Sequence, residues 1–166
     1  MHRKSKKEKL IGGDKIITKT FRLIPNELYG LFIIGDDINN YFHLPYEKMP
    51  NNEDDRFYIE EGSQYIFFDG LIDIWTISDK IKNEIIGTIK CTIECFWNGE
   101  NLIGMPFDKF LVVASQQYDH EDIIYVPISR DRGQNQRVYT FYDLGLQIWG
   151  WRNKIRTVLI SNYDED

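Results

Sequence analysis

Histidines and cysteines are the first candidates for chemistry in this 166-residue chain. The three histidines are His2, His43 and His120, and none has a partner at the short spacing that metal sites use. Acidic residues beside His120 could gather a cation, but loops of this composition are usually just solvated. Cys91 and Cys95 lie in a segment expected to be one strand, about 13 Å apart and too distant for a disulfide. The sequence therefore predicts no metal site and two buried thiols.

Paired carboxylates are the second candidates, because two acids across a cleft can act as general acid and base. They occur at residues 36–37, 53–55 and 60–61, and their spacing places no two pairs across a cleft. The chain has no glycine-rich phosphate-binding pattern and no serine-nucleophile pattern, and Ser115 has no evident general base. We therefore predict that the protein is not an enzyme and uses no cofactor.

The charge of the chain favours a protein partner. Lys and Arg total 20 against 26 Asp and Glu, for a net charge of −6; the first nine residues contribute +4, which leaves −10 for residues 10–166. Such an acidic body repels phosphates and suits a basic protein. No apolar run approaches a membrane span of about 18 residues, and no apolar export segment follows the basic start MHRKSKKEKL. The expectation is a cytoplasmic protein that binds neither nucleic acid nor membrane.

An internal repeat is the strongest pattern in the sequence. The segment YIFFDGLIDIW (65–75) matches YTFYDLGLQIW (139–149) at five of eleven positions without a gap, including Trp75 over Trp149. We expect these tryptophans in the core. Aligned apolar residues also follow both segments at a spacing of 69, and the same spacing places Gly35 over Gly104 upstream. Each glycine is expected to let the chain turn sharply into a helix.

The repeat predicts an α+β fold of two similar halves, each a short helix packed on an antiparallel β-meander. One helix is expected to begin near Asp36 and the other near Pro106, which suits a first helical position. Because either half alone has a small core, the halves should share an interface or a continuous sheet. The expected divisions are a basic disordered tail (1–14), a first α+β repeat (15–97), a second α+β repeat (98–161) and an acidic tail (162–166).

Two resemblances add to this interpretation. The stretch NLIGMPFDKFL (101–111) is similar to the helix entry of tandem α/β modules such as the β-lactamase inhibitory protein, although Pro106 stands where those modules have Thr. The small, acidic, motif-free body and the stretch YTFYDLGLQIWGWRNKIRTVLIS (139–161) resemble immunity proteins of bacterial polymorphic-toxin and contact-dependent inhibition systems. That resemblance implies an antitoxin that binds a cognate toxin, often a basic nuclease, and blocks its active site.

The leading hypothesis is therefore an immunity protein that neutralises a basic toxin by occlusion. Acidic loops at 43–55 and 116–122 would steer the toxin, and aromatic side chains would supply the buried contacts. The expected partner-binding residues are Tyr46, Asp54, Asp55, Tyr118, Asp119, Glu121, Asp122 and Trp151. The alternative is a small-molecule or peptide-binding module with an aromatic-lined groove between the halves. An enzyme would instead need two buried acids at that junction.

Overall fold

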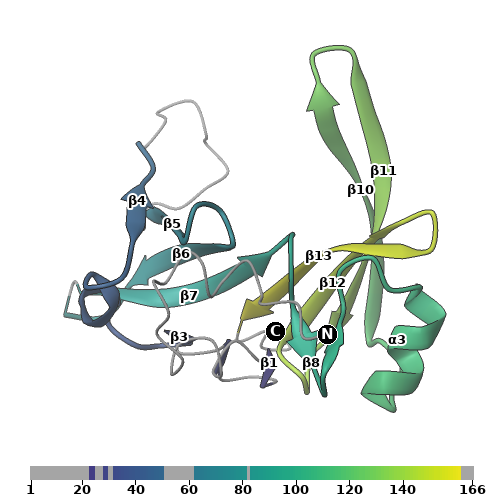
Figure 1. Cartoon of the computed structure of the whole chain (residues 1–166), viewed down its shortest axis with the longest axis horizontal. Coiled ribbons are helices and arrows are strands. Elements are labelled where there is room, and N and C mark those ends of the chain that lie inside the picture. Colours follow the sequence, from purple (N-terminus) through teal and green to yellow (C-terminus); the bar gives the residue numbers. More distant parts are fainter. Residues whose placement is uncertain (1–22, 25–27, 30–31, 51–61, 82, 162–166) are drawn as a thin grey trace, which may run out of the picture.

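The fold is one large antiparallel sheet with its helical elements on one side. The computed structural model describes residues 23–24, 28–29, 32–50, 62–81 and 83–161. Eight strands form the sheet in the order β10-β11-β12-β13-β7-β6-β5-β4 (Figure 1). They are β4 (Tyr46–Lys48), β5 (Gln64–Phe67), β6 (Ile72–Ser78), β7 (Glu84–Cys91), β10 (His120–Ser129), β11 (Arg132–Phe141), β12 (Leu146–Trp151) and β13 (Lys154–Ser161). The smaller elements are β1 (Leu23–Ile24), β2 (Leu28–Tyr29), β3 (Phe32–Ile33), the 3-10 helix η1 (Ile38–Tyr41), β8 (Phe96–Trp97), β9 (Glu100–Asn101) and the helix α3 (Phe107–Ala114).

The sheet consists of two four-stranded meanders, β4–β7 and β10–β13, joined where β7 pairs with β13. Burial alternates along β5 and β12, as expected when one face of a strand packs on a core and the other does not. The core therefore lies on a single face, against η1 and α3. Its fully buried members include Phe67, Ile74, Ile89, Phe110, Phe141, Ile148 and Val158.

The aligned segments occupy matching registers in the two meanders. Tyr65 pairs with Ile74 as Tyr139 pairs with Ile148, and each meander has an irregularity directly after its aligned tryptophan. Gly35 and Gly104 have φ values of 90° and 85°, and each donates its N–H to a carbonyl on the last strand of its own meander. Glycine adopts this left-handed backbone conformation at little energetic cost, so the chain can turn toward the helical segment at both positions.

The predicted α+β class is wrong, because the structure is mostly β. Only the second expected helix forms, as the two-turn α3; the first is reduced to the four residues of η1. Asn39 and Asn40 favour turns over helix interiors, and Pro45 follows closely, so the segment after Asp37 supports a single 3-10 turn. The eight strands then dominate the architecture in place of a helix in each half.

Two loop predictions also need correction. The expected loop at 43–55 contains β4, and the expected loop at 116–122 runs into β10 from His120. The segment RDRGQNQ (130–136), whose composition favours a turn, is mostly β11, so β10 and β11 form a long hairpin. Residues 1–22, 51–61 and 162–166, which include both predicted tails, lie outside the described residues.

Candidate ligand-binding groove

A groove of about 380 Å³ opens on the sheet face that the core does not use. In Figure 1 the β4–β5 and β10–β11 ends rise away from the side that carries α3 and β8. The groove crosses the junction of the two meanders. It is lined by Trp75, Thr76, Ile77, Thr88, Lys90, Val126, Gln136, Trp149, Thr157 and Leu159.

The two tryptophans lie at equivalent positions of the two meanders. Trp75 on β6 pairs with Thr88 on β7, and Trp149 on β12 pairs with Thr157 on β13. β7 and β13 lie between β6 and β12, and Thr88 pairs with Ser161, four residues along β13 from Thr157. The two tryptophan backbones are therefore about 20 Å apart, three strand spacings across the sheet and four residues along it. Lys90 and Leu159, which pair with each other, lie between the two threonines in the groove.

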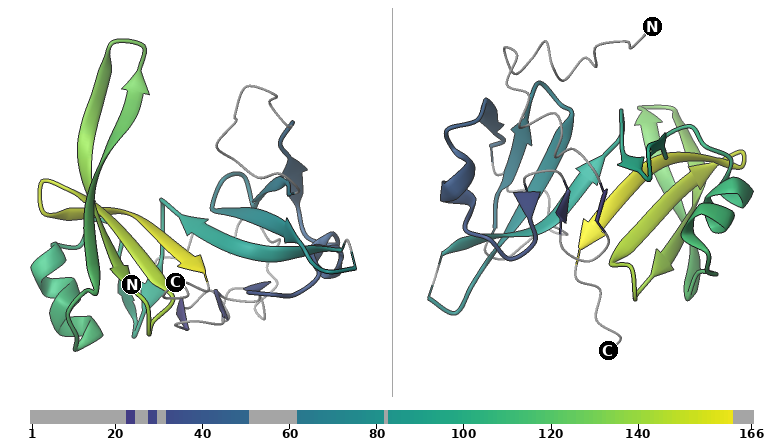
Figure 2. Two further views of the ribbon diagram at one scale, coloured as in Figure 1. Left: turned by 180° about the vertical axis from the view of Figure 1, so that it is seen from behind. Right: turned by 60° about the horizontal axis from the view of Figure 1, so that its bottom comes forward.

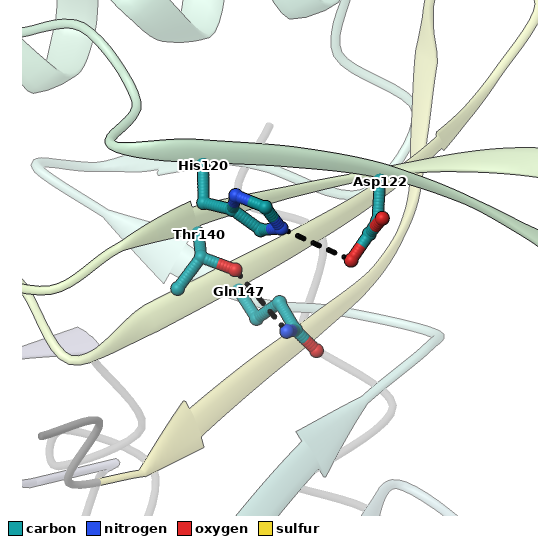
Figure 3. A network of polar contacts seen from close by, with 4 residues as sticks. All are labelled: His120, Asp122, Thr140 and Gln147. Carbon is teal, nitrogen blue, oxygen red and sulfur yellow. Dashed lines mark hydrogen bonds and ion pairs between the residues drawn. The ribbon is translucent and has the colours of Figure 1, made fainter. Parts of the chain in front are cut away.

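Hydrogen bonds fix the orientation of Trp149. Its Nε1 donates to Gln147 Oε1 at 2.9 Å, and Gln147 Nε2 donates to Thr140 Oγ1 at 3.2 Å. Figure 3 shows the Thr140–Gln147 contact next to the contact between His120 Nε2 and Asp122 Oδ2 at 3.1 Å. The Thr140–Gln147 pair therefore holds one aromatic wall of the groove in place.

The groove offers a cation and an acceptor. Lys90 on β7 pairs with Asp73 on β6, and its Nζ lies 5.5 Å from the centroid of the Trp75 ring. Burial raises the pKa of the Asp73 carboxyl, and the positive charge of Lys90 opposes that rise. Gln136 is 7% exposed, and its Oε1 has no hydrogen-bond partner in the described part of the protein. A buried acceptor without a donor is costly, so a ligand N–H or O–H would find a favourable site here.

The groove has no acid–base machinery. Its lining includes no carboxylate, histidine or cysteine among the described residues. Within the same residues, no group of three or more His, Cys, Asp or Glu could hold a metal ion. This lining can stack, hydrogen-bond and attract an anion, but it has no pair of groups for proton transfer.

The predicted partner-binding residues at the start of β10 already have partners within the protein. Asp119 Oδ2 accepts the backbone N–H of Tyr142 at 2.8 Å. Glu121 accepts from Tyr118 Oη at 3.1 Å and from Arg137 Nη1 at 2.7 Å. The hydrogen bond to Glu121 raises the pKa of the Tyr118 hydroxyl. These acids therefore stabilise the base of the β10–β11 hairpin, and Asp122 contacts His120 beside them.

The other predicted residues lie at separate places. Tyr46 is 44% exposed on β4, the opposite edge strand, with its ring stacked on Phe42 at 4.6 Å. Trp151 ends β12, where Arg152 and Arg156 lie over its ring at 4.3 and 5.5 Å. Asp54 and Asp55 lie outside the described residues. The described members thus do not form one continuous surface.

Sequence reasoning missed the groove because it placed Trp75 and Trp149 in the core. A signal was present in LIDIWTI (71–77), where Asp73 among alternating apolar residues indicates a solvent-facing side of the strand; Trp75, two residues later, shares that side. Thr88 and Thr157, which are 69 residues apart like the two glycines, both line the groove. Gln136 has no such signal, because its segment RDRGQNQ has the composition of a turn.

The comparisons with known proteins identified no matching family model, no similar curated protein and no similar solved structure. None of the helices in the described ranges has the length and apolar character needed to cross a membrane.

Proposed function

We propose that this protein is a binding module that holds a small planar ligand, or a flat side chain of a peptide, in the groove flanked by Trp75 and Trp149. The observation that carries the proposal is the groove, with two tryptophans at equivalent registers and Thr88, Lys90, Leu159 and Thr157 between them. Aromatic walls with a few directed polar groups are typical of small-molecule sites.

The polar groups of the groove indicate which class of ligand it can bind. Lys90 favours an anionic substituent, and the unpartnered Oε1 of Gln136 favours a ligand with an N–H or O–H donor. Stacking on the indole rings favours a planar ring. The proposal is binding without catalysis, since the described lining lacks acid–base groups.

Fluorescence titration with anilinonaphthalene sulfonate, an aromatic anion with a planar naphthalene ring, tests the proposal. Thr88→Phe should fill the floor of the groove and weaken binding of the dye more than tenfold. Thr92→Phe, the same change at an exposed position just beyond β7, should leave binding unchanged. Lys90→Gln should weaken binding by a smaller factor, because it removes only the cation. Equal binding to the wild type and the Thr88→Phe variant would refute the groove as a ligand site.

Inhibition of a basic toxin, the function expected from the sequence, stays a prediction. The described acidic residues that it uses have internal partners, so they would have to exchange those contacts for the toxin's. Capture of the product of the neighbouring gene, with an assay of its activity, tests that hypothesis. A cytoplasmic location is likewise proposed; the free, buried thiols of Cys91 and Cys95 fit a reducing compartment.

A further inference from the structure

The outer part of the β10–β11 hairpin is a two-stranded ribbon that projects from the sheet. Pairing with β12 ends at Arg137, so residues 124–136, here called the arm, have no third strand beside them within the described structure. Figures 1 and 2 show the arm extending beyond the rest of the molecule. Two-stranded ribbons are marginally stable in water unless another surface supports them.

The arm exposes large apolar side chains along β10. Tyr125 and Ile128 are 61% and 62% exposed, and Ile124 is also exposed. The Tyr125 ring crosses to β11 and occupies the space that a Cβ at Gly133 would need. Since soluble proteins seldom leave such a row in water without a use, the arm has the character of an interaction surface.

The same strand forms one edge of the sheet. None of the described strands pairs with the outer side of β10, although β10 is ten residues long. Edge strands are usually short, charged or otherwise protected from pairing with another chain. Here the central apolar stretch has one such device, Pro127, which removes a single backbone donor.

Charge along β10 identifies what would pair with it. The base carries the acids Glu121 and Asp122, and the tip carries Arg130 and Arg132 around Asp131. An antiparallel second copy of the same strand would place the acidic base of each chain against the basic tip of the other. A strand with an apolar centre and opposite charges at its ends is thus complementary to itself.

We propose that two copies of this chain associate through β10, edge to edge and antiparallel, about a twofold axis beside Val126. This register places Asp122 opposite the other copy's Arg130, and Ile124 opposite its Ile128. Because the contact uses the same patch on both copies, it closes as a dimer and does not propagate into a filament. The two bodies lie at opposite ends of the paired arms, so they do not collide.

Sedimentation velocity of the full chain over a range of concentrations tests the proposal. The wild type should sediment as a dimer that dissociates on dilution. Asp122→Arg and Arg130→Asp should each weaken the dimer at least tenfold, because like charges then face each other, and the double exchange should restore it. Lys80→Asp, an exposed charge reversal in the β6–β7 connection, should have no effect.

Disulfide trapping tests the register itself. Residues on the axis of an antiparallel pair have Cα atoms about 4.5–5.5 Å apart, within disulfide range. Val126→Cys should therefore form a cross-linked dimer on mild oxidation, whereas Asn135→Cys on β11 should not. A wild type that stays monomeric at every concentration, or a dimer that neither charge reversal weakens, would overturn the proposal. Association only with a foreign peptide would do the same. The groove assay is read on monomer and dimer alike, so the two proposals fail separately.

Discussion

The β4–β7 and β10–β13 meanders share their centre and differ at their edges. In both, an aromatic strand pairs in the same register with the strand that carries the aligned tryptophan, and a left-handed glycine leads into the helical segment. At the edges, β4 has three residues whereas β10 has ten. The helical segments also differ, four residues of η1 against eight of α3.

The two meanders agree where packing on the core constrains the strands, and they differ where the core does not. The shared strands pack one face on the core, so a shift of register by one residue would move every apolar side chain to the wrong face. The edge strands β4 and β10 lie at the ends of the sheet, where strand length and charge can change without disturbing the core. The groove is lined mainly by the shared strands, together with Val126 of β10 and Gln136 of β11, and the proposed dimer uses the outer edge of β10.

The largest expected effect concerns the aromatic residue that each helical segment buries. Phe110 on α3 is fully buried, with its ring 5.4 Å from Phe141, and Tyr41 on η1 is buried against Phe32 at 5.0 Å. Phe110→Ala and Tyr41→Ala should each lower the free energy of unfolding by about 3–5 kcal/mol. Chemical denaturation measures both. A loss under about 1 kcal/mol at Tyr41 alone would show that η1 is dispensable and would break the equivalence.

The two glycine turns should respond alike and more weakly. No atom lies within 4 Å of where a Cβ would be at Gly35 or Gly104, so the cost of alanine comes from the backbone conformation alone. Each alanine variant should lose about 1–2 kcal/mol of stability. Asparagine, which tolerates this conformation better, should lose less at both positions. Thermal unfolding compares the four variants, and a clear loss at only one glycine would contradict a common role.

The smallest expected effect is a difference between the two meanders in how the free energy of unfolding depends on pH. Burial, followed by the hydrogen bond from its hydroxyl to Asp36, raises the pKa of Tyr41. Below about pH 10 the folded and unfolded states both keep the proton, and above it the unfolded state loses the proton first. The free energy of unfolding should therefore fall as pH rises above 10. Tyr41→Phe should reduce that slope and cost about 1 kcal/mol at neutral pH, because the hydrogen bond is lost.

The matched variant Phe110→Tyr supplies the control for that measurement. It adds a hydroxyl at the equivalent position of the second meander, where Asp36 has the counterpart Met105 and offers no carboxylate. Stability measured between pH 7 and pH 11 should show no compensating gain from this hydroxyl. An unchanged slope in Tyr41→Phe would mean that other tyrosines, such as the buried Tyr65, account for the alkaline loss.

Much of the sheet could be predicted from the sequence, and much of the site could not. The strand β6 follows from the alternation in LIDIWTI, and the bend at Gly104 follows from the residue type. The prediction of an α-helix beginning near Asp36 was wrong, because Asn39 and Asn40 favour a turn at this place in the chain. The groove was not predicted, because the match between Trp75 and Trp149 indicates only that their positions are equivalent, and equivalent positions need not be buried.

By itself the sequence determined a doubled strand pattern, the two glycine turns and the absence of recognisable catalytic motifs, because these depend on residue type and local spacing. Only the tertiary structure decided that β7 pairs with β13, and hence that Trp75 and Trp149 flank one groove. It also decided that β10 lies at an edge with its apolar side chains exposed. Pairing between distant strands depends on how the two meanders meet, and no local preference of either segment encodes that meeting.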